Sequence, residues 1–298
     1  MKLRSLLYLL AATAAVAQTS PRPRPPRAWL DPDHSEPPGM HYRTFQSRLA
    51  GGEVSYLIHL PPDYETNASM RYPVMYWLHG YSANPRAGSM FVSPLDDAIR
   101  RGKAPAMIVV MVNGLTATYY RDSVDGKWPV ESVIMKELIP HIDQTYRTMA
   151  TRETRAVEGF SMGGYGAAHL GFKYPDIFGI VVIGSGAFSD SAGLGPQHKA
   201  ENGGKSVMSL APKAYFEEND VATLIRRNAD AIRGRTLVRI TVGNEDGLFR
   251  NNQAVHELLT QLKIEHEYEI IPGVGHDSGK IYRILGDRRY ALYLRAFK

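Results

Sequence analysis

Short apolar runs rich in β-branched residues alternate with helical patterns along this chain of 298 residues, and this alternation constrains the fold most. Each run ends in glycine-rich or polar residues, which is typical of a strand buried in a parallel sheet. Strands are predicted at 43–49, 54–60, 72–78, 107–112, 154–158, 180–183, 237–242 and 266–271. Helices are predicted at 95–101, 130–146, 165–174, 221–233, 251–262 and 281–297. The pattern predicts an α/β fold with a mostly parallel central sheet flanked by helices on both faces.

The first 17 residues have the pattern of a secretory signal peptide. Lys2 and Arg4 precede an apolar run at 6–16, small residues end this run, and cleavage is predicted after Ala17. Eleven apolar residues are too few to cross a bilayer, which needs about 20. We therefore expect a secreted or periplasmic protein whose mature chain has no membrane span.

Shifts in composition divide the remaining chain into a linker and one large domain. Residues 18–39 are rich in proline and arginine and are predicted to form an extended linker. Residues 40–298 are predicted to form a single domain, since one α/β domain can reach this length. Within it, the stretch at 185–235 is polar and glycine-rich, and we predict that it is a cap-like insertion.

The formal net charge of +5 comes from the N-terminus alone. Residues 1–30 hold five of the 35 Lys and Arg side chains and none of the 30 acidic ones, so the remaining chain is neutral overall. A nucleic-acid-binding domain needs a basic surface, and we therefore expect no nucleic-acid partner. The chain has no cysteine, which excludes disulfides, thiol nucleophiles and zinc–thiolate sites.

The sequence GFSMG, centred on Ser161, joins a predicted strand to a predicted helix. This strand–turn–helix context is the one that a nucleophile elbow requires. The turn is strained, and glycine two residues to either side of the serine avoids side-chain clashes. The backbone N–H of Met162 lies at the start of the helix, where negative charge is favoured. We predict that Ser161 is a nucleophile and that Met162 donates one hydrogen bond to an oxyanion.

Two other predicted strand ends carry candidate partners for this serine. His276 lies in a glycine-rich loop after the last strand, where the chain order serine, acid, histidine places the base. Asp246 follows the strand at 237–242, and its carboxylate is predicted to accept the second ring N–H of His276. Glu245 is the alternative acid at this turn. Asp277 is adjacent to His276, which hinders the geometry that a triad needs.

Two further loops are predicted to complete the site. The strand at 72–78 is followed by HGY, and we predict that the N–H of Tyr81 is the second oxyanion donor. The side chain of His79 is predicted to be structural. The polar stretch at 113–128 supplies Tyr119, Tyr120 and Trp128 as candidate substrate-binding residues. Their rings would stack on a sugar or aryl ring, and the alternative is that they pack the loop.

Patterns for other chemistries are incomplete. His256 and Glu257 open the H-E-x-x-H motif of zinc peptidases, but Thr260 stands at the place of the second histidine. The chain has no P-loop, and no dinucleotide-binding glycine motif follows a predicted strand. The sequence therefore implies no metal and no cofactor.

Longer motifs carry a close family resemblance. ELIPHIDQTYRT, RAVEGFSMGGYGA and KYPDIFG lie between residues 119 and 178, and YLIHLPPDY, WLHGY, GNEDGL and PGVGHD follow the same order and spacing as in the family. The chain resembles the esterase D-like branch of the α/β-hydrolases, which includes feruloyl and acetylxylan esterases of carbohydrate esterase family one. The resemblance covers residues 42–297 and implies an α/β-hydrolase fold with 40–298 as the catalytic domain. It also implies a triad of Ser161, Asp246 and His276, and an oxyanion hole formed by the N–H groups of Tyr81 and Met162.

A serine carboxylic ester hydrolase that works through an acyl-enzyme is the function that this resemblance implies. Predicted export, a neutral domain and the aromatic loop favour a carbohydrate-linked ester, feruloyl or acetyl, on a small molecule or a polysaccharide. The alternatives are an acyltransferase, an enterochelin-esterase-like hydrolase and a non-catalytic carbohydrate-binding protein. The last of these would be expected to have lost a member of the triad. No pattern indicates an oligomeric state.

Overall fold

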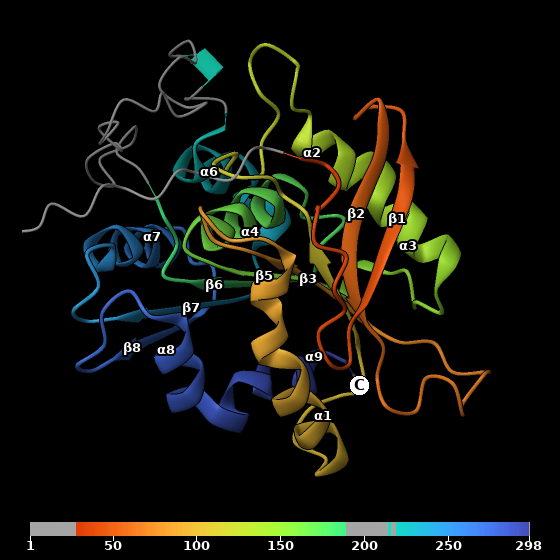
Figure 1. Ribbon diagram of the computed structural model, residues 1–298. Helices are drawn as coiled ribbons and strands as arrows, with labels where there is room; N and C mark the ends of the chain where they lie inside the picture. Colours follow the sequence, from red (N-terminus) through yellow and green to blue (C-terminus); the bar gives the residue numbers. More distant parts are fainter. Residues whose placement is uncertain (1–27, 189–213, 216–218, 298) are drawn as a thin grey trace, which may run out of the picture.

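An eight-stranded sheet forms the centre of the molecule in a computed structural model that describes residues 28–188, 214–215 and 219–297 (Figure 1). Its strands are β1 (His41–Ser47), β2 (Gly52–His59), β3 (Val74–Leu78), β4 (Ile108–Val112), β5 (Arg155–Phe160), β6 (Ile180–Gly184), β7 (Leu237–Gly243) and β8 (Glu267–Ile271). The spatial order is β1-β2-β4-β3-β5-β6-β7-β8. β1 and β2 form an antiparallel hairpin, β2 is antiparallel to β4, and the other neighbours are parallel. The predicted α/β fold with a mostly parallel sheet is confirmed.

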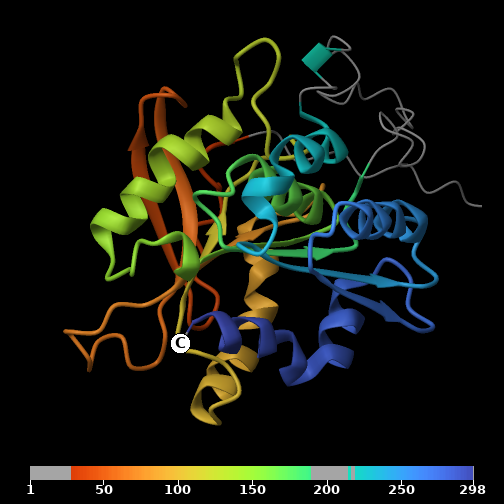
Figure 2. The same cartoon turned by 180° about the vertical axis from the view of Figure 1, so that it is seen from behind.

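Helices cover both faces of this sheet, as Figures 1 and 2 show from opposite sides. One face carries α1 (Val92–Arg100), α8 (Ser278–Leu285) and α9 (Ala291–Ala296). The other carries α2 (Val130–Val133), α3 (Ile139–Thr145), α4 (Met162–Lys173), α6 (Val221–Ile232) and α7 (Phe249–Gln261). Because successive side chains of a strand point to opposite faces, β3 contributes to two cores. Tyr76 packs in the core under α4, and Met75 and Trp77 pack in the core under α1.

All eight predicted strands are present, but two of the predicted helices are interrupted. The single helix predicted at 281–297 is wrong, because α8 ends at Leu285 and the next residue, Gly286, has a φ of +50°. A 3-10 turn, η6 (Gly286–Tyr290), then leads into α9. The helix predicted at 130–146 contains a π-helical turn, η2 (Ile134–Leu138), between α2 and α3. Pro140 follows this turn and has no N–H to donate to it, which explains the local widening.

Parts of the predicted organisation lie outside the described residues. These parts are the signal peptide at 1–17, residues 18–27 of the linker, and most of the cap predicted at 185–235. Within the predicted cap stretch, α6 is described and packs on α4. Among the helices that the structure describes, none combines the length and the apolar character needed to cross a membrane.

The parallel strands place their carboxyl ends at one edge of the sheet. The loops that follow β3, β4, β5, β7 and β8 therefore meet at that edge. In sheets of this kind, ligands bind outside the carboxyl ends of the strands. The residues singled out in the sequence fall in these loops.

Candidate active site

Ser161 occupies a strained turn between β5 and α4. Its φ of +61° and ψ of −119° are unfavourable for any residue with a side chain, and such strain is characteristic of functional sites. The flanking glycines make the turn possible. A Cβ on Gly163 would lie 1.9 Å from the carbonyl oxygen of Leu78, and one on Gly159 would lie 2.3 Å from the backbone of Gly163. The glycine spacing of the sequence motif therefore reflects close backbone contacts.

His276 reaches Ser161 from the loop after β8. Its Nε2 lies 2.9 Å from the Oγ of Ser161. The imidazole rests against the ring of Phe160, with 4.8 Å between the ring centroids. The side chain is 40% exposed, so it lies open to solvent at the carboxyl edge. The carboxylate of the neighbouring Asp277 caps α8 instead, because it accepts the N–H of Lys280.

Asp246 lies behind His276 in the loop after β7. Its Oδ2 is 2.8 Å from the Nδ1 of His276, and its Oδ1 accepts the N–H of Leu248 at 2.8 Å. The Asp246 side chain is only 1% exposed. Burial alone would raise the pKa of this carboxyl, but the hydrogen bonds from His276 and Leu248 outweigh it and hold the pKa below its usual value. Glu245 is exposed, and Asp246 takes the position beside the imidazole.

These contacts form one chain of hydrogen bonds with a defined direction. The ionised Asp246 can only accept, so the Nδ1 of His276 carries the proton and donates it. The Nε2 is then the acceptor for the hydroxyl of Ser161. This arrangement lets the imidazole take the serine proton while the carboxylate stabilises the resulting imidazolium.

The loop after β3 lies against the serine and is held by buried groups. A Cβ on Gly80 would lie 3.8 Å from the Cβ of Ser161, so the turn that leads into Tyr81 closely approaches the nucleophile. His79 donates from Nδ1 to the carbonyl of Gly80 at 2.9 Å, and its Nε2 accepts the N–H of Gly114 at 3.3 Å. Burial lowers the pKa of His79 to about 4, so the imidazole is neutral at neutral pH. Its buried position and backbone contacts agree with the predicted structural role.

Met162 is the first residue of α4. The N–H groups of the first helical turn have no carbonyl partner within the helix, and the helix dipole adds partial positive charge there. Ser161 immediately precedes this turn, so the place of Met162 is compatible with its predicted role as an oxyanion donor. Tyr81 and Met162 thus belong to the two segments that flank Ser161.

The aromatic candidates of the loop after β4 pack inward. Tyr120 is fully buried, and its hydroxyl donates to the carbonyl of His79 at 3.0 Å. Tyr119 is 2% exposed and contacts Tyr165 edge to face. Trp128 is partly buried and lies against Trp29, with ring centroids 6.3 Å apart. The burial of the two tyrosines favours the packing alternative, and a substrate-stacking role for these residues remains a prediction.

The loop after β4 also contains backbone strain that the sequence analysis did not predict. Leu115, Ala117, Tyr119 and Tyr120 all have φ values between 56° and 59°, and all four are buried. Such a conformation persists only where surrounding contacts fix it. Here the Tyr120 ring fills the space beside Gly114, so the strained loop supports the segment that carries Tyr81.

Asn252 is a positioning residue that the sequence interpretation missed. It is fully buried, its Nδ2 donates to the carbonyl of Gly186, and its Oδ1 accepts the N–H of the same residue. The next residue, Ala187, donates to the carbonyl of Ser161 at 2.9 Å. A buried asparagine on the inner face of α7 thus fixes the backbone beside the elbow. Asn252 could have been found in the sequence as a polar residue on the apolar face of the helix predicted at 251–262.

The sheet topology, the serine elbow and the Ser161–His276–Asp246 hydrogen bonds define an α/β-hydrolase of the serine type. A family model described as "Putative esterase" matches residues 47–295. The chain belongs to this family of esterases.

Curated relatives are esterases as well. The chain is 32% identical over 267 residues to "Esterase Rv1288" of Mycobacterium tuberculosis, an alignment that covers 83% of this chain and 57% of that protein. It is 35% identical over 146 residues to an "Endo-1,4-beta-xylanase/feruloyl esterase" of Xylanibacter ruminicola, covering 46% of this chain and 20% of that protein. The chain therefore spans less than two thirds of the length of either relative.

Solved structures share the fold at lower identity. A "ferulic acid esterase" superposes with a TM-score of 0.75 at 22% identity, covering 87% of this chain and 98% of that one. The S-formylglutathione hydrolase FrmB of Staphylococcus aureus superposes with a TM-score of 0.69 at 18% identity, covering 86% and 99%. These likenesses establish the α/β-hydrolase fold.

Proposed function

We propose that this protein is a serine carboxylic ester hydrolase that works through an acyl-enzyme. One observation carries the proposal, namely the chain of contacts from Ser161 Oγ to His276 Nε2 and from His276 Nδ1 to Asp246, set at a strained elbow. Membership of the esterase family supports the same chemistry.

In the first half of the reaction, Ser161 Oγ attacks the ester carbonyl while its proton passes to the Nε2 of His276. The carbonyl oxygen becomes an oxyanion, which the N–H groups of Tyr81 and Met162 stabilise. When the intermediate collapses, the bond to the alcohol oxygen breaks and His276 returns the proton to that oxygen. The alcohol leaves, and the acyl group remains on Ser161.

In the second half, water takes the place of the alcohol. His276 removes a proton from the water as it attacks the acyl carbonyl, and the same two N–H groups stabilise the second oxyanion. Collapse then breaks the bond to Ser161 Oγ, which regains its proton from His276. The carboxylic acid is released, and the hydrogen bonds from Ser161 through His276 to Asp246 are restored.

The substrate we propose is a carbohydrate-linked ester with a feruloyl or acetyl group. The resemblance to carbohydrate esterases supports this class, and one relative is named as a xylanase and feruloyl esterase. The N-terminal pattern of a signal peptide supports action outside the cytoplasm.

Hydrolysis by the mature protein beside Ser161→Ala tests the proposed function. The substrates are nitrophenyl acetate, nitrophenyl butyrate, methyl ferulate and acetylated xylan. Turnover that disappears in Ser161→Ala and persists in Ser69→Ala, a control at an exposed serine, is the expected result. Equal rates for the wild type and Ser161→Ala would refute the proposal. Product analysis with an added sugar acceptor separates transfer to water from transfer to a sugar.

A further inference from the structure

Phe160 lies between the nucleophile and the base of the active site. It is the last residue of β5, directly before Ser161, and it is 8% exposed. The centroids of the Phe160 and His276 rings are 4.8 Å apart, and the ring planes are inclined by 39°. Two rings at this distance and inclination cannot meet edge to edge, because the ring radii would bring their atoms into overlap. The imidazole therefore lies over the face of the Phe160 ring.

An apolar cluster holds the Phe160 ring in this place. Its other buried members come from the end of β8, the loop that carries His276, and α8, namely Ile271, Val274, Ile281 and Leu285. On β6, a Cβ on Gly184 would lie 3.0 Å from the Cδ2 of Phe160, so the backbone there also approaches the ring closely. Phe160 thus joins the strand of the nucleophile to the loop of the base, and close packing fixes the orientation of its ring.

A compensated charge lies behind Phe160. Tyr282 of α8 meets Phe160 edge to face, with ring centroids 6.4 Å apart, and the guanidinium of Arg289 lies 4.2 Å from the centroid of the Tyr282 ring. The carboxylate of Glu158 accepts a hydrogen bond from Arg289 at 3.0 Å, and both residues are buried. The positive charge of Arg289 is therefore paired with Glu158, and the rings of Tyr282 and Phe160 lie between it and the imidazole.

The contact with Phe160 uses a side of the imidazole that the triad leaves open. Asp246 bonds to Nδ1 and Ser161 to Nε2 of His276, and hydrogen bonds at these nitrogens lie in the plane of the ring. Among the residues that the structure describes, Asp246 is the ionised side chain that bonds to this imidazole. The face of an aromatic ring carries partial negative charge and attracts a cation within about 6 Å of its centroid. The attraction is stronger once His276 has taken the serine proton, so it favours the transition state over the ground state.

We propose that Phe160 is a positioning residue for the base. Its ring holds the His276 imidazole beside Ser161, and its negative face stabilises the imidazolium that forms in each half of the reaction. This inference rests on the proposed ester hydrolysis. An aliphatic side chain at this position would fill the apolar cluster but would lack the negative face.

The variant Phe160→Leu tests this proposal through the pH profile of kcat/KM for nitrophenyl acetate. We expect the plateau of the profile to fall about two- to fivefold, and its acidic limb to move to lower pH by about half a pH unit, because the protonated imidazole loses its stabilisation. Phe178→Leu is the matched control, because Phe178 is buried in the core under α4 beside Tyr76, and it should leave the limb in place. An unmoved limb in Phe160→Leu, at whatever plateau, or an equal shift in Phe178→Leu, would overturn the proposal.

Fluorinated phenylalanines test the same contact with nearly the same ring shape. Fluorine withdraws electron density from the ring face, so monofluoro-, difluoro- and trifluorophenylalanine at position 160 weaken its attraction for a cation in steps. We expect the acidic limb to move to lower pH in the same order. The same series at position 178 is the control and should leave the limb unchanged. A limb that is independent of the fluorine number at position 160 would overturn the proposal.

A titration without turnover separates this proposal from the proposed function. The protonation of the His276 ring is followed by NMR in Ser161→Ala, with and without Phe160→Leu. We expect the added Phe160→Leu change to move the titration midpoint to lower pH by about half a pH unit. Equal midpoints would overturn the role of Phe160. A midpoint that depends on Phe160 in a protein that hydrolyses no ester would instead refute the proposed function and leave the contact in place.

Discussion

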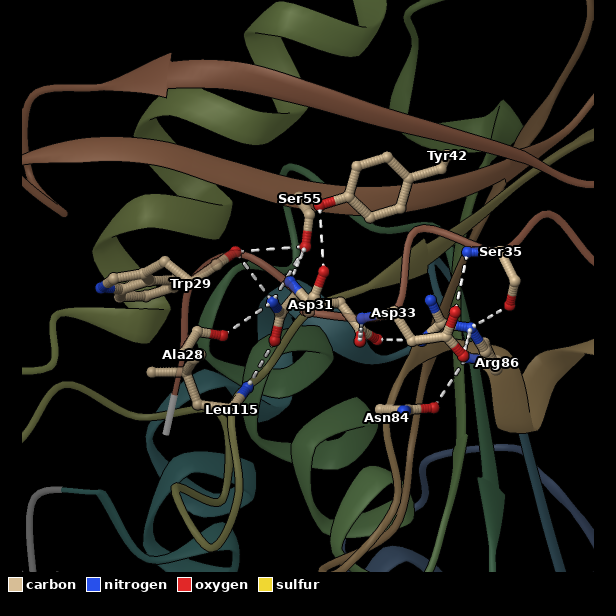
Figure 3. A network of polar contacts seen from close by, with 11 residues as sticks. Ala28, Trp29, Asp31, Asp33, Ser35, Tyr42, Ser55, Asn84, Arg86 and Leu115 are labelled. Carbon is tan, nitrogen blue, oxygen red and sulfur yellow. Dashed lines mark hydrogen bonds and ion pairs between the residues drawn. The ribbon is translucent and has the colours of Figure 1, made fainter. Parts of the chain in front are cut away.

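The two sides of the active-site edge are built in different ways. On the side of β5, β7 and β8, each reacting side chain comes from a short glycine-containing motif that fixes its own turn. On the side of β3 and β4, the loops are held by contacts such as Asn113 with Trp29 and Arg86 with Asp31, which lie 84 and 55 residues apart (Figure 3). The reacting side chains thus depend on local sequence motifs, whereas the loops on the other side depend on contacts between residues far apart in the sequence.

This difference predicts that changes on the two sides will affect different quantities. Substitutions on the side of β5, β7 and β8 should reduce turnover of every ester by a similar factor. Substitutions on the side of β3 and β4 should change stability or the choice of ester.

The largest effect is expected at the nucleophile and its base. Ser161→Ala, His276→Ala and the double variant should each lower kcat by about 10⁶, because a nucleophile and a base that act as one unit lose activity together. Steady-state rates on nitrophenyl acetate measure this, with thermal unfolding as the control for folding. A double variant whose loss equals the product of the two single losses would show that the two residues act independently.

The acid should have the next largest effect. Asp246→Ala should lower kcat by about 10⁴, since the imidazolium loses its stabilising carboxylate and the imidazole loses its fixed tautomer. Glu245→Ala is the matched control, because this neighbouring acid is exposed, and it should retain activity close to that of the wild type. A larger loss of activity in Glu245→Ala than in Asp246→Ala would mean that Glu245, and not Asp246, is the acid of the triad.

On the side of β3 and β4, the buried His79 should make the free energy of unfolding depend on pH. Burial lowers its pKa from 6.5 to about 4 in the folded state, so the unfolded chain binds the proton more readily. Stability should therefore fall as the pH drops from 6.5 to 4, by about 3 kcal/mol in total. Denaturant unfolding at pH 7 and pH 4 measures this loss in the wild type and in His79→Gln. Equal pH dependence in the two proteins would contradict the neutral, buried imidazole.

The smallest effect is expected at Tyr120, whose hydroxyl supports the segment that carries Tyr81. Tyr120→Phe removes the donor to the carbonyl of His79 and should lower the free energy of unfolding by about 1–2 kcal/mol. Tyr290→Phe is the control, because the described part of the chain offers its buried hydroxyl no hydrogen-bond partner. Equal losses in both variants, measured by denaturant unfolding, would assign the effect to packing rather than to the hydrogen bond.

Much of the fold and the reacting site could be predicted from sequence because both depend on local physical rules. β-branched runs with glycine-rich ends gave all eight strands, and the glycines around Ser161 indicated a turn that the structure places at a φ of +61°. The chain order of serine, acid and histidine indicated which strand ends would meet. Contact between Asp246 and His276 follows from β7 and β8 being neighbours.

The remaining features depend on contacts that no local pattern reveals. The break in the predicted helix at 281–297 comes from one glycine whose left-handed backbone could not be distinguished from a tolerated helical glycine. The inward packing of Tyr119 and Tyr120 depends on four strained residues in a row of six. The contacts of Ala28 and Trp29 depend on Asn113, which sequence alone offers only as a polar residue after a strand.

Trapping of the acyl group tests the central claim most directly. The mature protein would be mixed with nitrophenyl acetate, quenched in acid during turnover and digested, and the mass of each peptide measured. We predict one acetyl group on the peptide that contains Ser161, and none in the same peptide from Ser161→Ala. Rapid ester hydrolysis with the label on another residue would contradict an acyl-enzyme at Ser161.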